Sequence, residues 1–159
     1  MSTHIPARTP AHHEDDLSQI PALVLLQTLG YEYLSPSEAL ALRGGRESQV
    51  LLVDVLAEQL RRINRVRYRG EELPFSESAI AEAIRQLRDV DQGDGLLRTN
   101  HAVWELLRLG TSQEQTIRGD KKSHTLNYVD WKNPANNRFH VTEELSVTRA
   151  TGETSRRPD

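Results

Sequence analysis

The spacing of apolar residues changes once along this chain, near Gly110, and that change restricts the folds open to it. Before Gly110 the apolar residues recur at the intervals of amphipathic helices, and after it they mostly alternate with polar residues, as in half-exposed strands. No repeat and no separate linker divides the two parts. The sequence therefore predicts an α+β fold over residues 18–159, with a helical N-terminal two-thirds and then an antiparallel β-ribbon. Residues 1–17 are expected to form a flexible arm.

Several helix boundaries carry recognisable signals. Ser18 is a candidate N-cap, and Pro21 falls within the first turn that follows it. Ser35 and Glu38 form a capping-box pattern, and Ser76 can cap a later helix. The expected helices run from Ser18 to Leu29, from Ser35 to Gly44, from Val50 to Ile63, from Ser76 onward and from Leu96 to Leu109. We expect the first helix to be buried, because its apolar residues cover most of its circumference.

Other positions are expected to lie in turns and strands. A loop is expected around Gly70 and Pro74. The residues of the last helix expected to face inward are Val103, Trp104, Leu106 and Leu107. The segments 113–117 and 124–131, on either side of residues 118–122, read as a hairpin, and residues 132–137 are rich in turn-forming types. One alternating strand then follows, with its apolar side formed by Phe139, Val141, Leu145 and Val147.

Composition excludes several kinds of site. The chain has 159 residues and no cysteine, which excludes a disulfide, a thiolate zinc site and a thiol nucleophile. Neither Arg43–Arg46 nor Gly93–Gly95 has the spacing of a phosphate-binding glycine loop. The longest apolar run, Ile20–Leu26, is far shorter than the ~20 residues that span a bilayer. With no signal peptide at the N-terminus, we expect a cytoplasmic protein without a membrane partner.

Positive charge is concentrated locally, although the net charge is −3. Residues 43–69 contain an excess of arginine over acidic residues. These arginines could contact phosphate, or they could form a solvated helix face whose charge suits the C-terminal end of the helix dipole. The candidates for DNA contact are Arg61, Arg62, Arg65, Arg67 and Arg69.

Seven stretches, in order along the chain, resemble the beginning of the restriction (R) subunit of type I restriction–modification enzymes. They are Ile20–Pro36, Val50–Leu52, Arg62–Asn64, Phe75–Glu77, Leu107–Thr116, Tyr128–Glu144 and Arg157–Asp159. The strongest is Tyr128–Glu144, and the combination covers about residues 18–159. In that family the region is a nuclease domain of the PD-(D/E)xK type, and an ATP-driven DNA translocase follows it. The resemblance therefore implies the N-terminal portion of a restriction-endonuclease-like core.

The resemblance also implies a catalytic site. Arg157-Pro-Asp159 falls on the family motif, so Asp159 would be the first catalytic, metal-binding carboxylate, with Mg²⁺ as the metal. Arg156 and Arg157 would contact DNA or pair with nearby glutamates. In the family an acid-x-Lys motif follows this carboxylate on the next strand, and these 159 residues stop before it, so we expect this stretch not to cleave DNA by itself. Glu14 is a candidate for a further helix-borne acid of the family, which the resemblance does not assign.

The implied partners are double-stranded DNA and the methyltransferase (M) and specificity (S) subunits, and ATP would act only through the motor domain. Two other hypotheses remain open. Helices followed by a β-ribbon also describe a winged-helix-like DNA-binding module. The third hypothesis is a truncated product that is inert by itself. Cleavage by a longer chain would favour the nuclease, and binding to duplex DNA with a steep salt dependence would favour the module.

Overall fold

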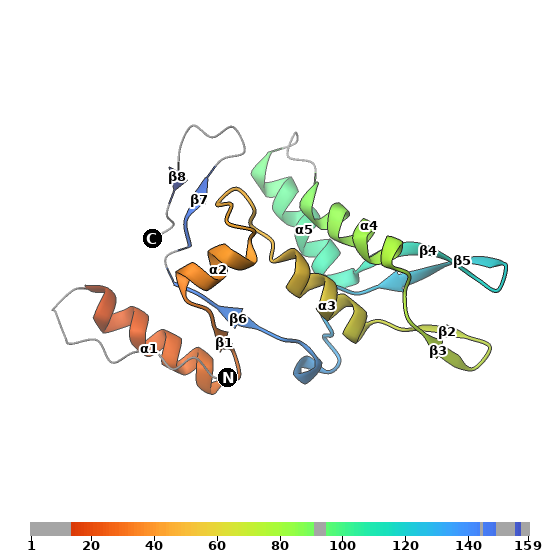
Figure 1. Ribbon diagram of the computed structural model, residues 1–159, viewed down its shortest axis with the longest axis horizontal. Helices are drawn as coiled ribbons and strands as arrows, with labels where there is room; N and C mark the ends of the chain where they lie inside the picture. Colours follow the sequence, from red (N-terminus) through yellow and green to blue (C-terminus); the bar gives the residue numbers. More distant parts are fainter. Residues whose placement is uncertain (1–13, 91–94, 144, 149–154, 157–159) are drawn as a thin grey trace. The chain divides into compact units, whose positions relative to one another are not determined.

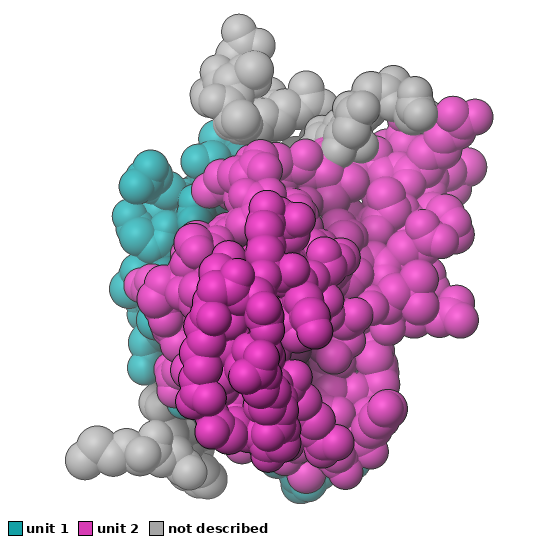
Figure 2. Space-filling model, turned by 90° about the vertical axis from the view of Figure 1, so that its right-hand side faces the viewer, with its two compact units in different colours: residues 1–52, 138–159 teal, residues 53–137 magenta. Residues whose placement is uncertain are grey.

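The computed structural model (Figure 1) describes residues 14–90, 95–143, 145–148 and 155–156, with the backbone alone at 14–17 and 155–156. The chain divides into two compact units, one of residues 53–137 and one of residues 1–52 with 138–159 (Figure 2). Helices and two-stranded sheets occur in both units, so the predicted α+β class is confirmed. In the described ranges, no helix is both long and apolar enough to cross a membrane.

The unit of residues 53–137 has a continuous apolar core. Its elements are α3 (Val53–Ile63), β2 (Val66–Tyr68), β3 (Glu71–Leu73), α4 (Glu77–Arg88), α5 (Leu96–Leu109), β4 (Thr111–Ile117), β5 (Asp120–Leu126) and the 3₁₀ turn η1 (Pro134–Asn136). The largest fully buried side chains are Leu60, Val66, Ile80 and Leu126. Burying each such side chain stabilises the fold by about 1.5–3 kcal/mol, so α4 and the two hairpins are held mainly by apolar contact.

Two buried polar side chains connect the elements of this core. The Asn64 side chain donates to the carbonyl oxygens of Leu60 (3.0 Å) and Asn127 (2.8 Å), and it accepts from the Asn127 N–H (2.8 Å). The Tyr128 hydroxyl donates to the carbonyl oxygen of Ala83 (2.7 Å). Burial raises the pKa of Tyr128 to about 12. The end of α3 and the segment after β5 are therefore joined by hydrogen bonds as well as by packing.

The other unit is built from two segments that are distant in sequence. Its elements are α1 (Glu14–Thr28), β1 (Glu32–Tyr33), α2 (Pro36–Leu42), β6 (His140–Val141), β7 (Val147–Thr148) and β8 (Ser155–Arg156). β1 and β6 run parallel, whereas β7 and β8 run antiparallel. The predicted capping box at the start of α2 is confirmed, because the Ser35 side chain accepts from the Glu38 N–H and the Glu38 side chain accepts from the Ser35 N–H.

The first helix differs from the prediction. It begins at Glu14, so residues 14–17 belong to the helix rather than to the expected arm, and Pro21 lies inside it rather than in its first turn. It is not a buried helix: Leu23 is buried, but Val24 and Leu25 are 48% and 59% exposed. A helix that is apolar on all sides has no preferred face, so neighbouring elements decide which side is covered.

The expected single strand after residue 138 is also wrong. Two short strands, β6 and β7, replace it, and β6 pairs in parallel with β1 through the bonds from Glu32 N–H to Phe139 O (2.9 Å) and from Leu34 N–H to Val141 O (2.9 Å). Alternation reports which residues share a face of an extended chain. It does not report where pairing partners from other parts of the chain begin and end.

The expected loop around Gly70 is instead a hairpin. β2 and β3 pair through a two-residue turn in which Arg69 and Gly70 both have positive φ, 49° and 87°. The β4–β5 hairpin turns in the same way at Arg118 and Gly119, so its turn is shorter than predicted. The second strand is shifted from the expected 124–131 to 120–126, because the tighter turn lets pairing begin at Asp120. Trp104, expected to face inward, is 52% exposed.

Candidate functional site

The residues implied for catalysis lie at the edge of what the structure describes. Asp159 and Arg157 are outside the described residues, and Arg156 is the last residue of β8, where only the backbone is described. Glu14, the candidate helix-borne acid, is the first residue of α1. Within the described ranges, no three His, Cys, Asp or Glu residues are grouped so as to hold a metal ion.

β8 is the described element that leads to Asp159. It pairs with β7 in antiparallel register, with Val147 opposite Arg156 and Thr148 opposite Ser155. Each strand contributes only two residues to this pairing. A ribbon of this length is not stable alone, so other contacts must hold β7 in place.

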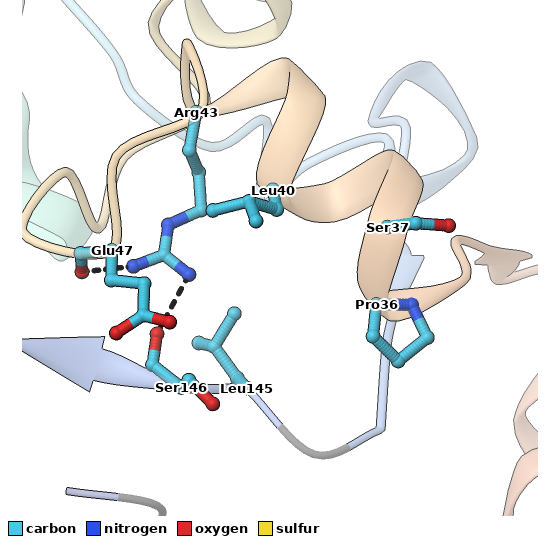
Figure 3. A pocket seen from close by; sticks show the side chains of 7 residues that line it. All are labelled: Pro36, Ser37, Leu40, Arg43, Glu47, Leu145 and Ser146. Atoms are coloured by element: carbon cyan, nitrogen blue, oxygen red, sulfur yellow. Dashed lines mark hydrogen bonds between the residues drawn. The ribbon is translucent and has the colours of Figure 1, made fainter. Parts of the chain in front are cut away.

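Arg43 supplies the strongest of these contacts. This arginine, the C-cap residue of α2, is only 4% exposed. Its guanidinium donates to the carbonyl oxygens of Gln49 and Glu47 and to that of Ser146 (2.9 Å). Figure 3 shows the guanidinium between the loop that carries Glu47 and the segment Leu145–Ser146. A planar guanidinium with donors on three nitrogens is suited to joining several oxygens at once.

Glu47 makes a second connection to the same strand. The Thr148 hydroxyl donates to a Glu47 carboxylate oxygen (2.5 Å), and the Thr148 N–H donates to the Glu47 carbonyl oxygen (3.4 Å). A pocket of about 200 Å³ opens beside these contacts. It is lined by Pro36, Ser37, Leu40, Arg43, Glu47, Leu145 and Ser146. Since backbone carbonyls occupy donors on all three guanidinium nitrogens, this arrangement is better suited to holding the chain than to binding an anion.

Charged side chains also join β1 to β6. The Arg138 guanidinium donates to both carboxylate oxygens of Glu32 (2.8 Å each), and this pairing lowers the pKa of Glu32. Burial lowers the pKa of His140, and the neighbouring Glu32 opposes that shift. The Tyr33 hydroxyl donates to Glu143 (2.9 Å). These contacts fix the register of β6 against β1, in the stretch of strongest family resemblance.

Most arginines proposed for DNA contact have partners within the protein. Arg61 pairs with Glu77 through two hydrogen bonds (2.9 and 2.6 Å), and the pKa of Glu77 is lowered by this bond. Arg65 donates to the carbonyl oxygens of Arg61 and Asn64 at the end of α3. These contacts fit the interpretation in which positive charge complements the helix terminus.

The remaining arginines of this group differ among themselves. Arg67 pairs with Glu72 across the β2–β3 hairpin (3.3 Å). Arg69 lies 3.5 Å from Asp120 and stacks over the Tyr68 ring, 5.1 Å from its centroid. Arg62 is exposed and makes no hydrogen bond or ion pair with the part of the chain that the structure describes. Among these arginines, Arg62 therefore has the most guanidinium N–H groups available to bind a phosphate.

Sequence reasoning missed Arg43. The sequence places Arg43 in a local excess of arginine expected to contact phosphate or to form a solvated face, and this expectation is wrong for Arg43, which is 4% exposed. One available signal was the position of an arginine immediately after a capped helix and before two glycines, which places a long cationic side chain at a chain reversal. The partner, Ser146, lies 103 positions away and carries no signal of its own.

Comparison with known proteins places the chain in a family. Residues 12–159 match the family described as type I restriction enzyme R protein N terminus. The type I restriction enzyme HindI endonuclease subunit of Haemophilus influenzae is 32% identical over 144 residues, which are 88% of this chain and 13% of that protein. No solved structure matches significantly. The α+β chain described above therefore belongs to the family of type I restriction enzyme R protein N termini, as its motifs implied.

The chain spans about 13% of the length of that curated relative. The activity of the whole relative therefore concerns a much longer protein. What the family assignment gives directly is the region: the N-terminal part of a type I R subunit.

Proposed function

We propose that this chain is the front part of the nuclease of a type I R subunit, and that the whole subunit cleaves unmethylated foreign DNA. One observation supports this most: the family match runs through residue 159, where Arg157-Pro-Asp159 coincides with the nuclease motif that the resemblance identifies. The reaction would require Mg²⁺, and ATP would be used by the motor domain of the subunit. The M and S subunits and double-stranded DNA would be its cytoplasmic partners.

The donor expected for the metal fits Mg²⁺. Asp159 offers carboxylate oxygens, the ligands that this ion prefers. When bound, Mg²⁺ supplies an activated water and stabilises the charge that develops on the phosphodiester. One carboxylate does not make a complete site, and the family's acid-x-Lys motif would provide the rest. We therefore propose that these 159 residues do not cleave DNA by themselves.

A first experiment replaces Asp159 in a chain that continues through the acid-x-Lys motif. We expect Asp159→Asn to reduce Mg²⁺-dependent cleavage by more than roughly 100-fold. Loss of a residue that only supports a metal ligand costs up to about that much, and Asp159 would be a ligand itself. Plasmid nicking measures the effect, and duplex DNA binding should change little. The control is Glu58→Gln, which removes an exposed carboxylate on α3. Full cleavage by Asp159→Asn, or nicking by the 159-residue chain, would refute the corresponding proposal.

We propose further that Arg62 contacts the DNA backbone, with Arg61, Arg65, Arg156 and Arg157 as weaker candidates. Arg62→Ala should weaken duplex binding equally for all sequences and lower the slope of log K against log salt by about 1. The matched control is Arg85→Ala on α4, because Arg85 is exposed but paired with Glu82 (2.6 Å). Equal salt slopes for Arg62→Ala and the unaltered chain would exclude this contact.

A second candidate function is a DNA-binding module without catalysis. The observation that favours it is the exposed arginine set around α3, β2 and β3, which belongs to the unit of residues 53–137 and is remote in sequence from Asp159. A chain extended through the acid-x-Lys motif would bind duplex DNA with a steep salt slope yet show no Mg²⁺-dependent nicking. An inert product would show neither property.

A further inference from the structure

Arg43 stands on a rigid element. The helix α2 that presents it is fixed at its N-terminus by the capping box of Ser35 and Glu38, with Pro36 at its first position. At the other end the Arg43 N–H donates to the Ala39 carbonyl oxygen (3.2 Å), so the backbone of Arg43 is itself held by the helix. The guanidinium is therefore presented from a defined place rather than from a loose loop.

Among the described residues, β7 is held by few hydrogen bonds. It pairs with β8 over two residues, and its second residue, Thr148, is bonded to Glu47 of the loop that Arg43 also holds. Arg43 thus joins two segments. It donates to the carbonyl oxygens of Gln49 and Glu47 on the loop, and to that of Ser146 immediately before β7.

We propose that Arg43 is a positioning residue for the nuclease: by joining the 47–49 loop to Ser146 it holds β7 and, through β7–β8 pairing, β8, the strand that precedes Arg157-Pro-Asp159 in the sequence. Asp159 lies three positions beyond Arg156, the last residue of β8. This inference rests on the proposed function, since it assigns Arg43 a role only if Asp159 is the metal-binding carboxylate. Arg43 would act through its hydrogen bonds to the carbonyl oxygens of Glu47, Gln49 and Ser146, and not as a catalytic residue.

The chemistry of the contact requires a guanidinium. A lysine carries the same charge, but its single ammonium nitrogen cannot reproduce a planar fork directed at carbonyls on two separate segments. Displacing a catalytic group by about 1 Å can cost on the order of 100-fold in rate. Arg43→Lys is therefore the informative variant, because it preserves charge and most of the volume while removing the geometry.

The experiment uses the intact R subunit with its M and S subunits. We expect Arg43→Lys to lower the DNA cleavage rate roughly 10- to 100-fold and to raise the Mg²⁺ concentration for half-maximal cleavage, while ATP hydrolysis is unchanged. Thr148→Val, which removes only the hydroxyl that binds Glu47, should have the same effects at smaller size. Arg46→Lys is the matched control, since Arg46 is an exposed arginine on the same loop.

A second measurement does not depend on cleavage. Hydrogen–deuterium exchange of peptides containing β7 should show faster exchange in Arg43→Lys by roughly tenfold, because charge-assisted hydrogen bonds to the flanking backbone are lost. Peptides from α4 should be unaffected. This readout separates displacement of the β7 segment from a general loss of folding.

Each outcome decides the matter. The positioning role is supported if Arg43→Lys cleaves more slowly and needs more Mg²⁺, and if faster hydrogen exchange is confined to β7. Parallel loss of cleavage and ATP hydrolysis, or faster exchange in α4 as well, means that Arg43 serves only general stability and overturns it. Unchanged cleavage in Arg43→Lys overturns it too, provided that Asp159→Asn is inactive in the same assay. If Asp159→Asn remains active, the proposed function itself has failed.

Discussion

The two units of this protein are stabilised by different physical means. The unit of residues 53–137 has eleven buried apolar or aromatic residues in one cluster, whereas in the described part of the other unit only Leu23 and Ala39 are buried hydrophobic residues. There the most connected buried group is a cation, Arg43, which binds backbone carbonyls. Apolar contact is non-directional and distributes its effect over many residues, but hydrogen bonds to carbonyls fix direction and depend on one side chain.

The two means of stabilisation suit different tasks. A distributed core tolerates apolar substitutions that conserve volume and provides a stable body. A directional anchor gives a short strand a defined position where its own pairing is too weak. The implied catalytic residue follows β8, the strand paired with β7, in the sequence, and the candidate DNA-contacting Arg62 lies on a helix of the unit with the apolar core.

The largest expected effect is loss of the apolar core. Ile80→Ala removes a side chain that is 1% exposed, so we expect unfolding of residues 53–137 to become easier by about 2–5 kcal/mol. Urea denaturation followed by tryptophan fluorescence measures it, because Trp104 and Trp131 both lie in this unit. Leu97→Ala, at a residue 87% exposed, is the control and should change stability by less than about 0.5 kcal/mol. Similar midpoints for both variants would contradict the contrast drawn above.

A smaller loss of stability is expected when Arg43 is replaced, and it is expected in the unit that contains β7. Arg43→Met keeps an unbranched side chain but removes the donor from the partly buried carbonyl oxygens of Glu47, Gln49 and Ser146, and an unsatisfied buried group costs about 1–3 kcal/mol. Since Arg43 belongs to the other unit, the tryptophan transition should stay close to its original midpoint while exchange at β7 accelerates. A shift of the tryptophan transition as large as that of Ile80→Ala would show that the two units do not respond independently.

The smallest effect concerns one polar group inside the apolar core. Tyr128→Phe removes the hydrogen bond to the Ala83 carbonyl, which is worth about 1 kcal/mol at neutral pH. The titration of Tyr128 also predicts how stability depends on pH. Its pKa is raised to about 12 from an ordinary value of 10, so the stabilisation is fully present below pH 10 and is lost as pH rises toward 12. Tyr128→Phe should therefore be less sensitive to alkaline denaturation in that range. An identical alkaline transition in both proteins would contradict the raised pKa of Tyr128.

Sequence patterns predicted local features well where a single stretch contains all of the cause. The capping box at Ser35 and the cap at Ser76 each act within a few residues, and both are found, whereas the predicted N-cap Ser18 lies inside α1. The turn and the alternation predict the β4–β5 hairpin, although β5 begins nearer the turn than expected, at Asp120, and ends at Leu126 rather than at Trp131. The same local patterns could not show that the apolar faces of α1 are only partly covered.

The sequence by itself determined the α+β class, the order of the helices and the family motifs that end in Asp159. Only the tertiary structure decided that β6 pairs with β1, that the 138–148 segment is broken into two strands, and that Arg43 reaches Ser146. The physical reason is the distance along the chain. Helix caps and turns are short-range, whereas strand pairing and a buried cation's carbonyl partners depend on which remote segments packing brings together.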